Sequence, residues 1–151
     1  MKVGDICTRT VVTVREFDDL TAAAQLMRQE HIGYLIVIEP NVGTNTAVPV
    51  GVVTDRDIVV AVVARETDPR TLKVGDVMTR QPVLVEEDSS VPAALYHMRE
   101  IGVRRLPVVG RGGVLSGVLS LDDVLEALAE ELTDVASSIR RELKVESALR
   151  P

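Results

Sequence analysis

The chain carries one segment twice, and this internal duplication limits the folds that it can adopt. Asp5-Ile6-Cys7-Thr8-Arg9 matches Asp76-Val77-Met78-Thr79-Arg80, and the match continues without a gap to Ile38 in the first copy and Val109 in the second. A repeat of this length indicates one structural unit present twice, with a core that depends on the neighbouring copy. The 151 residues are enough for two small units.

The copies also share a second motif, which recurs with the same residue types in the same order. Gly51-Val52-Val53-Thr54-Asp55-Arg56-Asp57-Ile58 corresponds to Gly117-Val118-Leu119-Ser120-Leu121-Asp122-Asp123-Val124. Each reads as a buried strand that ends in a hydroxyl residue, followed by a helix start with an aspartate three residues on. The first copy has a turn-rich insertion between Glu39 and Val50, which predicts an exposed loop.

The apolar patterns predict the same strand–helix–strand–strand–helix order in each unit. The expected strands span residues 11–14, 34–38 and 50–54 in the first unit, and 83–85, 105–109 and 114–120 in the second. Asp18 or Asp19 is the expected cap of the first helix, and Ser89 or Ser90, with Pro92 in the first turn, begins its counterpart. The second helix of the first unit should cover residues 55–65.

The last helix is expected to run from Leu121 to about Glu146. Its apolar residues follow a heptad-like spacing of three and four, at Leu125, Leu128, Leu132, Val135 and Ile139. The pattern covers only about two heptads, fewer than a coiled coil usually needs. It therefore predicts a long amphipathic helix that packs on its own domain or on a dimer partner.

Composition narrows the classes of function. The net charge is −6, and the sequence has no basic stripe of the kind that nucleic-acid binding needs. Cys7 is the only cysteine, which excludes an intrachain disulfide and a cysteine metal cluster. No apolar run is long enough to cross a bilayer, and the first residues do not resemble a signal peptide. We therefore expect a cytoplasmic protein that binds neither nucleic acid nor membrane.

The hydroxyl-x-x-aspartate corners allow two interpretations. One is a capping box, in which Thr54 or Ser120 accepts a hydrogen bond from the amide three residues on and the aspartate returns one. The other is a ligand site, because a helix start favours phosphate, Arg56 could add a charge-assisted contact, and Asp57 or Asp123 could accept both hydroxyls of a ribose. A single corner favours capping, whereas two matched corners give weight to the ligand interpretation.

The ordered set of motifs resembles a pair of cystathionine-β-synthase (CBS) domains, an arrangement called a Bateman module. The resemblance covers about residues 3–130 and rests on the two opening segments, the two corners, and the stretch Gly102 to Val109. It implies an α/β fold of two β-α-β-β-α units packed around a pseudo-twofold axis, followed by a long C-terminal helix. It also implies two clefts for adenosine compounds such as AMP, ADP, ATP, S-adenosylmethionine or NAD.

The resemblance assigns roles to particular positions of this sequence. It places ribose contacts at Asp57 and Asp123, and phosphate or ribose contacts at Thr54 and Ser120. Adenine would lie against Val11, Val12, Ile32 and Tyr34 in the first unit, and against Pro82, Val83, Val103 and Arg105 in the second. Thr8 and Thr79, just before the first strands, are expected to line the same clefts.

Two departures from the family pattern bear on these roles. Ile36 stands where the pattern expects proline, and Tyr34 could stack on a base or fill the mouth of its cleft. The second corner has Leu121-Asp122 where the first has Asp55-Arg56, so we expect a weaker phosphate site there unless Arg104 or Arg105 takes the place of the missing arginine.

No catalytic set can be assembled from the remaining residues. His31 and His97 have no partner at metal-ligand spacing, and Cys7 has no neighbouring base to activate it. We therefore expect a regulatory module that is not an enzyme, needs no cofactor, and binds an adenine nucleotide. Such a module would act as a homodimer and could signal to an unidentified effector protein. The alternative is a structural or protein-interaction module with empty clefts.

These expectations divide the chain into four parts. The first CBS unit would span residues 1–67, a linker 68–75, the second unit 76–130 and a C-terminal helical extension 131–151.

Overall fold

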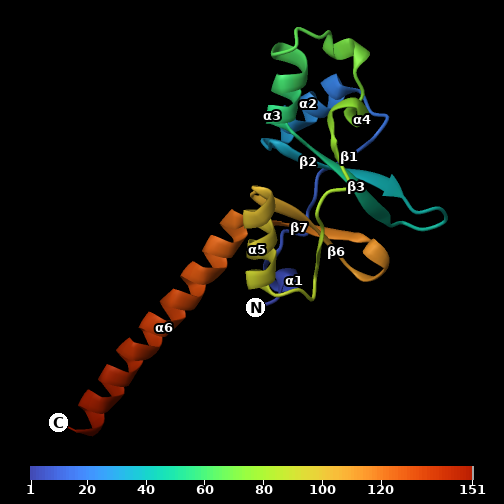
Figure 1. The fold of residues 1–151 in the computed structure, drawn as a ribbon. Coiled ribbons are helices and arrows are strands. Elements are labelled where there is room, and N and C mark those ends of the chain that lie inside the picture. Colours follow the sequence, from blue (N-terminus) through green and yellow to red (C-terminus); the bar gives the residue numbers. More distant parts are fainter. Residues whose placement is uncertain (151) are drawn as a thin grey trace.

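The computed structural model describes residues 1–150 and consists of two small α/β units with a long helix that projects from the second (Figure 1). The first sheet contains β1 (Thr13–Arg15), β2 (Tyr34–Pro40), β3 (Ala47–Thr54) and β4 (Thr79–Arg80), in that order. The second contains β5 (Val85–Glu86), β6 (Arg105–Val109) and β7 (Leu115–Ser120). The expected α/β class with paired repeats is confirmed.

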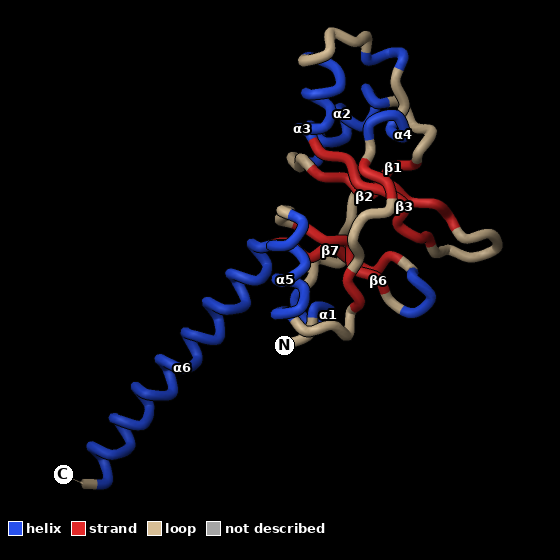
Figure 2. Tube along the Cα trace, in the orientation of Figure 1, coloured by secondary structure: helices blue, strands red, loops and turns tan. Residues whose placement is uncertain are grey.

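The three strands of the second sheet repeat the topology of β1, β2 and β3 in the first, and Figure 2 shows the strands of both units in red. In each sheet, a short first strand runs parallel to the second strand, which pairs antiparallel with the third. The short strands begin later than the β-branched pattern predicts, at Thr13 and Val85 instead of residues 11 and 83. The preceding residues line cavities instead of joining a ladder, and Pro82 has no N–H to contribute to one.

Helices cover the sheets at the predicted places. They are α2 (Leu20–Glu30), α3 (Asp55–Ile58), α5 (Val91–Ile101) and α6 (Leu121–Leu149). Ser90 caps α5 by accepting a hydrogen bond from the Ala93 amide at 3.3 Å. Asp19 occupies the N-cap position of α2, but its side chain makes no capping bond and pairs instead with Lys73. The helix predicted over residues 55–65 is α3 followed by a π-helical turn, Val59–Val63.

The opening segments of the two copies are exchanged between the units. Residues 2–9 contain α1 (Val3–Ile6), and residues 73–80 contain α4 (Val74–Val77). The amides of Val3 and Gly4 donate to backbone carbonyls at residues 89 and 87 of the second unit. The amides of Val74 and Gly75 donate to backbone carbonyls at residues 18 and 16 of the first. Each copy therefore supplies a piece of the other copy's core.

Reciprocal ion pairs follow the same exchange. Arg9 pairs with Glu87, and Arg80 pairs with Glu16 at 2.6 Å. Both pairs are partly exposed, so we expect each to contribute less than about 1 kcal/mol to stability. Their value is positional, because they join each opening segment to the loop after the first strand of the opposite unit.

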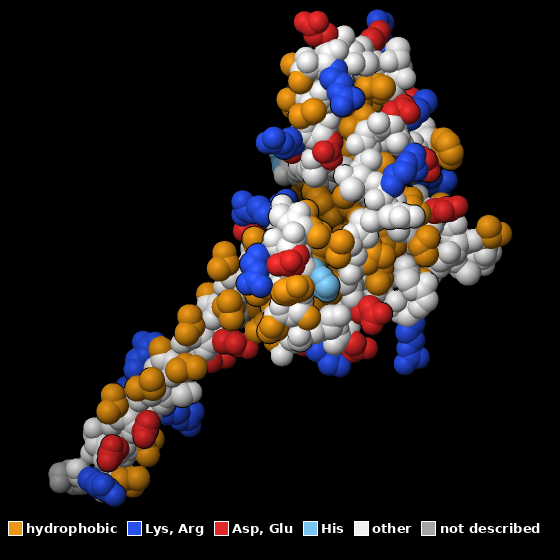
Figure 3. Space-filling model, in the orientation of Figure 1, with side chains coloured by type: hydrophobic (Ala, Val, Ile, Leu, Met, Phe, Trp, Pro, Cys, Tyr) orange, Lys and Arg blue, Asp and Glu red, His pale blue; other side chains and the backbone are white. Residues whose placement is uncertain are grey.

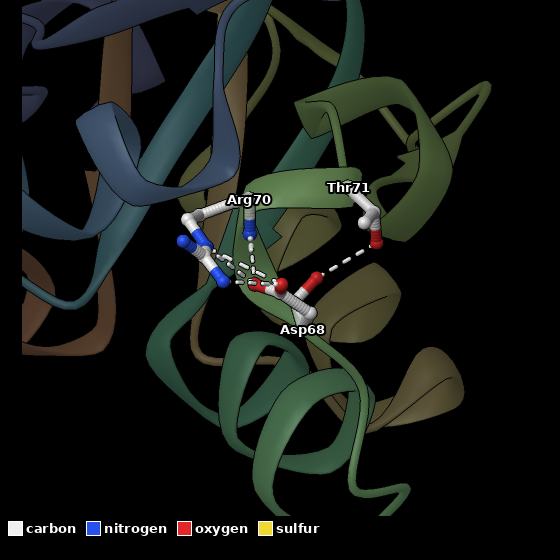
Figure 4. Close-up of polar contacts among 3 residues, drawn as sticks. All are labelled: Asp68, Arg70 and Thr71. Atoms are coloured by element: carbon white, nitrogen blue, oxygen red, sulfur yellow. Dashed lines mark hydrogen bonds and ion pairs between the residues drawn. The ribbon is translucent and has the colours of Figure 1, made fainter.

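The connection between the units is ordered by a local polar cluster (Figure 4). Asp68 accepts hydrogen bonds from the backbone amide of Arg70 at 3.0 Å and from its guanidinium at 2.9 Å, and the Thr71 hydroxyl donates to the Asp68 carbonyl at 2.7 Å. These bonds cap a short 3-10 helix, Pro69–Thr71. The hydrogen bonds from Arg70 lower the pKa of the Asp68 carboxyl.

The C-terminal ends of α2 and α5 differ in one residue of consequence. Both end in a left-handed residue, His31 with φ of 55° and Gly102 with φ of 69°. A side chain makes this conformation unfavourable by about 1 kcal/mol relative to glycine. We expect His31→Gly to raise the free energy of unfolding by about 1 kcal/mol and the melting temperature by about 2–4 °C, measured by thermal denaturation.

Two control variants accompany His31→Gly. Gly102→Ala should destabilise by a similar amount, since open space surrounds its Cβ position and only the backbone opposes the change. Glu30→Gly, one residue earlier and inside the helix, should also destabilise. If His31→Gly lowers the melting temperature, the His31 side chain stabilises the fold by more than its left-handed backbone conformation destabilises it.

Candidate functional site

The larger cavity, of about 540 Å³, lies between the corner of the first unit and a wall from the second. The corner is the junction of β3 and α3, and the wall comes from residues 79–83 and 101–107. Apolar side chains form this wall: Pro82, Val83, Ile101 and Val103. A cavity of this size accommodates a small-molecule ligand.

The corner of the first unit is a complete capping box. Thr54 Oγ1 accepts a hydrogen bond from the Asp57 amide at 3.2 Å, and Asp57 Oδ2 accepts one from the Thr54 amide at 2.9 Å. The capping interpretation is therefore correct. It uses only one carboxylate oxygen, and within residues 1–150 no hydrogen bond reaches Oδ1 of Asp57. The same residue can cap the helix and still present an acceptor to the cavity.

Three guanidinium groups line this cavity, from Arg56, Arg104 and Arg105. Arg56 makes no side-chain ion pair or hydrogen bond with any residue in the described range. Arg104 lies 3.8 Å from Asp122 in an exposed pair, which leaves most of its donors available. Arginine forks recognise phosphate and carboxylate groups through paired hydrogen bonds. The cavity thus combines an anion-binding region with an apolar wall.

The second cavity is smaller, about 180 Å³, and lies at the corner between β7 and α6. Asp123 Oδ2 accepts bonds from the Ser120 amide and hydroxyl, each at 2.7 Å, and Asp123 Oδ1 accepts one from the Thr8 hydroxyl at 3.3 Å. Both oxygens of this carboxylate are therefore bonded within the protein. A ribose bound here would have to share Oδ1 with Thr8 or displace it.

Tyr34 and Arg105 lie between the two cavities and line both. They occupy equivalent positions at the starts of β2 and β6, and the Arg105 guanidinium lies 5.8 Å from the centre of the Tyr34 ring. Burial raises the pKa of the Tyr34 hydroxyl, and the charge of Arg105 acts in the opposite direction. The tyrosine is therefore neutral at physiological pH and packs under the arginine as part of a shared wall.

Every candidate residue from the sequence lines one of these two cavities, but the cavities do not follow the division into units. The first cavity brings Thr54 and Asp57 together with residues of the second copy: Thr79, Pro82, Val83, Val103 and Arg105. The second brings Ser120 and Asp123 together with residues of the first copy: Thr8, Val11, Val12, Ile32 and Tyr34. The grouping by unit was wrong, because each opening segment lies on the opposite sheet.

Sequence reasoning missed some lining residues, including Gly33, Asp55 and Ile101. A Cβ at Gly33 would lie 2.4 Å from Asp55 Oδ2, so a larger residue there would require the exposed Asp55 side chain to move. The two residues are also joined by a 3.0 Å hydrogen bond from the Asp55 amide to the Gly33 carbonyl. One sequence signal could have indicated the position: Gly33 stands at the start of an apolar strand, where the second copy has Arg104.

The remaining reactive residues are placed away from these cavities or buried. Cys7 is buried in the core of the second unit, and desolvation there raises the pKa of its thiol. His97 stacks edge-on against Tyr96 with ring centres 5.8 Å apart. Among residues 1–150 no three His, Cys, Asp or Glu side chains are arranged to hold a metal ion. In the same range no helix is both long enough and apolar enough to span a membrane.

These features define a class of protein: a paired α/β repeat with two clefts, each built from both copies. The family model for the CBS domain matches residues 3–64 and 74–130, so the chain belongs to the CBS domain family.

Relatives differ in how much of their own length this chain covers. It is 31% identical over 126 residues to the protein MK0525 of Methanopyrus kandleri. The matched region covers 83% of this chain but only 62% of that protein. It is 35% identical over 126 residues to Hypoxic response protein 1 of Mycobacterium tuberculosis, covering 83% of this chain and 84% of the relative. The crystal structure of CBSX2 in complex with AMP matches with a TM-score of 0.71 at 28% identity, covering 85% of this chain and 96% of CBSX2.

Proposed function

We propose that this protein is a regulatory module that binds an adenine nucleotide and has no catalytic activity of its own. The observation that carries the proposal is the larger cavity, in which a capping aspartate with one unbonded oxygen faces three arginines and an apolar wall. The similarity to CBSX2, whose structure contains AMP, supports the same ligand class.

The cavity suggests how AMP would be held. The ribose hydroxyls would donate to Asp57, and the phosphate would lie against Arg56 and Arg104. The adenine ring would pack between apolar residues of the second copy, such as Val83 and Val103, because aliphatic side chains cover a base without demanding a hydrogen-bond pattern. Of the family's ligands, we favour AMP, because it carries a single phosphate and its size suits a cavity of about 540 Å³.

Nucleotide binding would regulate by shifting a conformational equilibrium. A ligand in the larger cavity would contact Asp57 from the first copy and Val103 from the second at once. It would therefore favour the arrangement of the two units in which both contacts are made. We further propose that the protein acts as a homodimer in the cytoplasm and that an effector protein responds to the change. The free thiol of Cys7 is compatible with a reducing compartment.

Isothermal titration calorimetry with AMP tests the proposal. We expect one AMP per chain, because the second cavity is smaller and the carboxylate of Asp123 is already bonded. GMP serves as the matched control for the base, and incubation of AMP with the protein should leave it unchanged by NMR. The absence of binding with AMP, ATP, S-adenosylmethionine and NADH at millimolar concentration would instead favour a protein-interaction module with empty clefts.

A further inference from the structure

The structure leaves one long apolar surface uncovered, on helix α6. Six aliphatic side chains, 44% to 70% exposed, line one face of this helix (Figure 3). We call them the α6 stripe: Leu125, Leu128, Leu132, Val135, Ile139 and Leu143. Single exposed leucines are ordinary, but a continuous row of this length marks an interaction surface. Of the two expected alternatives for α6, packing on its own domain does not hold for its exposed part (Figure 1), and packing on a dimer partner remains.

The chain's own units cannot cover the stripe. Leu121–Leu149 is one uninterrupted helix without glycine or proline, so it has no point at which it could fold back. Most of the stability of a helix in a protein comes from the packing of its apolar face. The occupant must therefore come from another molecule.

The charges along α6 indicate what that molecule is. Residues 122–134 contain six acidic side chains and no basic one, whereas residues 140–150 contain four basic side chains and two acidic ones. Parallel pairing of two α6 helices would place the acidic halves together. Antiparallel pairing places the acidic half of each helix along the basic half of the other, and it also aligns the helix dipoles favourably.

We propose that α6 binds α6 of a second copy of this chain in an antiparallel, two-fold symmetric pair. The stripe residues fit one register. Leu125 would face Leu143 of the second copy, Leu128 would face Ile139, and Leu132 would face Val135. The Leu128–Ile139 and Leu132–Val135 pairs share a midpoint between residues 133 and 134, which places the two-fold axis there. The midpoint of the Leu125–Leu143 pair, at residue 134, lies half a residue away, so these two side chains would meet slightly staggered.

The charges suit the same register at the level of whole segments. The acidic segment that contains Asp122 and Glu126 would lie over the same stretch of the pair as the basic segment that contains Arg140 and Lys144 of the second copy. Ala129 and Ala136 flank the stripe, and their small side chains let the helices approach closely. The pair would hold the two nucleotide-binding bodies at opposite ends. This inference goes beyond the proposed nucleotide binding and does not depend on it.

Single-cysteine variants and a short bis-maleimide crosslinker test the register. Leu132→Cys should crosslink to itself, because the two copies of this residue flank the axis. Leu125→Cys should not, because its copies would lie about 26 Å apart along the axis at 1.5 Å per residue. A mixture of Leu125→Cys and Leu143→Cys should give the heterodimer. The wild-type chain, whose one thiol is buried, is the control. Self-crosslinking of Leu125→Cys would show parallel pairing and overturn the proposal.

Sedimentation equilibrium tests whether the stripe forms the interface. Leu132→Glu should raise the dimer dissociation constant at least tenfold, whereas Ser137→Glu on the opposite face should leave it unchanged. Both variants should bind AMP as the wild type does, which separates this test from the proposed function. A monomeric wild-type chain, or a Leu132→Glu dimer as stable as that of the wild type, would contradict the proposal. Capture of a different partner by a monomeric chain would do so as well.

Discussion

Gly117→Ala is expected to lower the free energy of unfolding by about 3 kcal/mol and the melting temperature by about 6–10 °C. A Cβ at this position would lie 2.8 Å from the Thr8 carbonyl oxygen and 3.0 Å from Cys7 Sγ. The carbonyl cannot withdraw easily, because Thr8 and Val118 exchange two backbone hydrogen bonds of 2.9 Å. Differential scanning calorimetry measures the effect.

Two matched glycines set the scale for this result. Gly51 is the counterpart in the first copy, where a Cβ would lie 2.7 Å from the sulfur of the flexible Met78 side chain and 3.0 Å from the Thr79 carbonyl oxygen. Because the carbonyl is slightly farther away than at Gly117, Gly51→Ala should be somewhat less destabilising. Gly110→Ala should be nearly neutral, since its nearest neighbour is 3.6 Å away. If the Gly117→Ala and Gly110→Ala variants have the same melting temperature, the exchanged opening segment is not held as closely as the structure indicates.

Asp57→Asn is expected to weaken AMP binding at least 30-fold, equivalent to about 2 kcal/mol. Asparagine keeps an oxygen that can accept from the Thr54 amide, so the cap survives, but it removes the negative charge and one acceptor from the cavity. The melting temperature without nucleotide should therefore change by less than about 2 °C. Calorimetric titration with AMP, paired with thermal denaturation, measures both effects.

Asp123→Asn is the matched control, because it makes the same change at the second corner. It should leave the AMP affinity of the larger cavity within about threefold of the wild type, a difference below about 1 kcal/mol. Asp57→Ala would be less informative, since it also removes the capping bond at a cost of about 1 kcal/mol. Unchanged affinity in Asp57→Asn would mean that Asp57 serves only as a cap.

Local features of the fold were predictable because local chemistry determines them. The Ser90 cap and the β6–β7 hairpin follow from hydroxyl, turn and alternating apolar residues that lie close together in the sequence. The strand starts at Thr13 and Val85 were less predictable, because the β-branched residues before them have strand propensity but do not continue the ladder, apart from one long 3.4 Å bond from the Ile36 amide to the Val12 carbonyl. The π-helical turn at Val59–Val63 has no sequence signal that we recognise.

The sequence predicted which residues line a cavity, but not which of the two cavities each residue lines. The family resemblance places residues such as Thr54 and Val83 at a cleft, because they match motif positions that line a cleft in related proteins. Which cleft they share depends on where the opening segments dock. That is decided by contacts between distant residues, such as Thr8 with Val118, 110 positions apart, and Gly75 with Glu16, 59 positions apart. Periodicity and turn chemistry carry no information on such contacts. Because local patterns do not report distant contacts, the length of α6 was predictable from the sequence, whereas the exposure of its apolar face was not.

The exchange of opening segments has a consequence for how the protein can be divided. A cut between residues 65 and 72 would not release two autonomous domains, because each fragment would carry away a helix and a strand or bridge that the other fragment needs to close its core. Separately produced fragments should remain largely unfolded alone and regain native structure on mixing. The duplicated chain thus behaves as an interlocked pair.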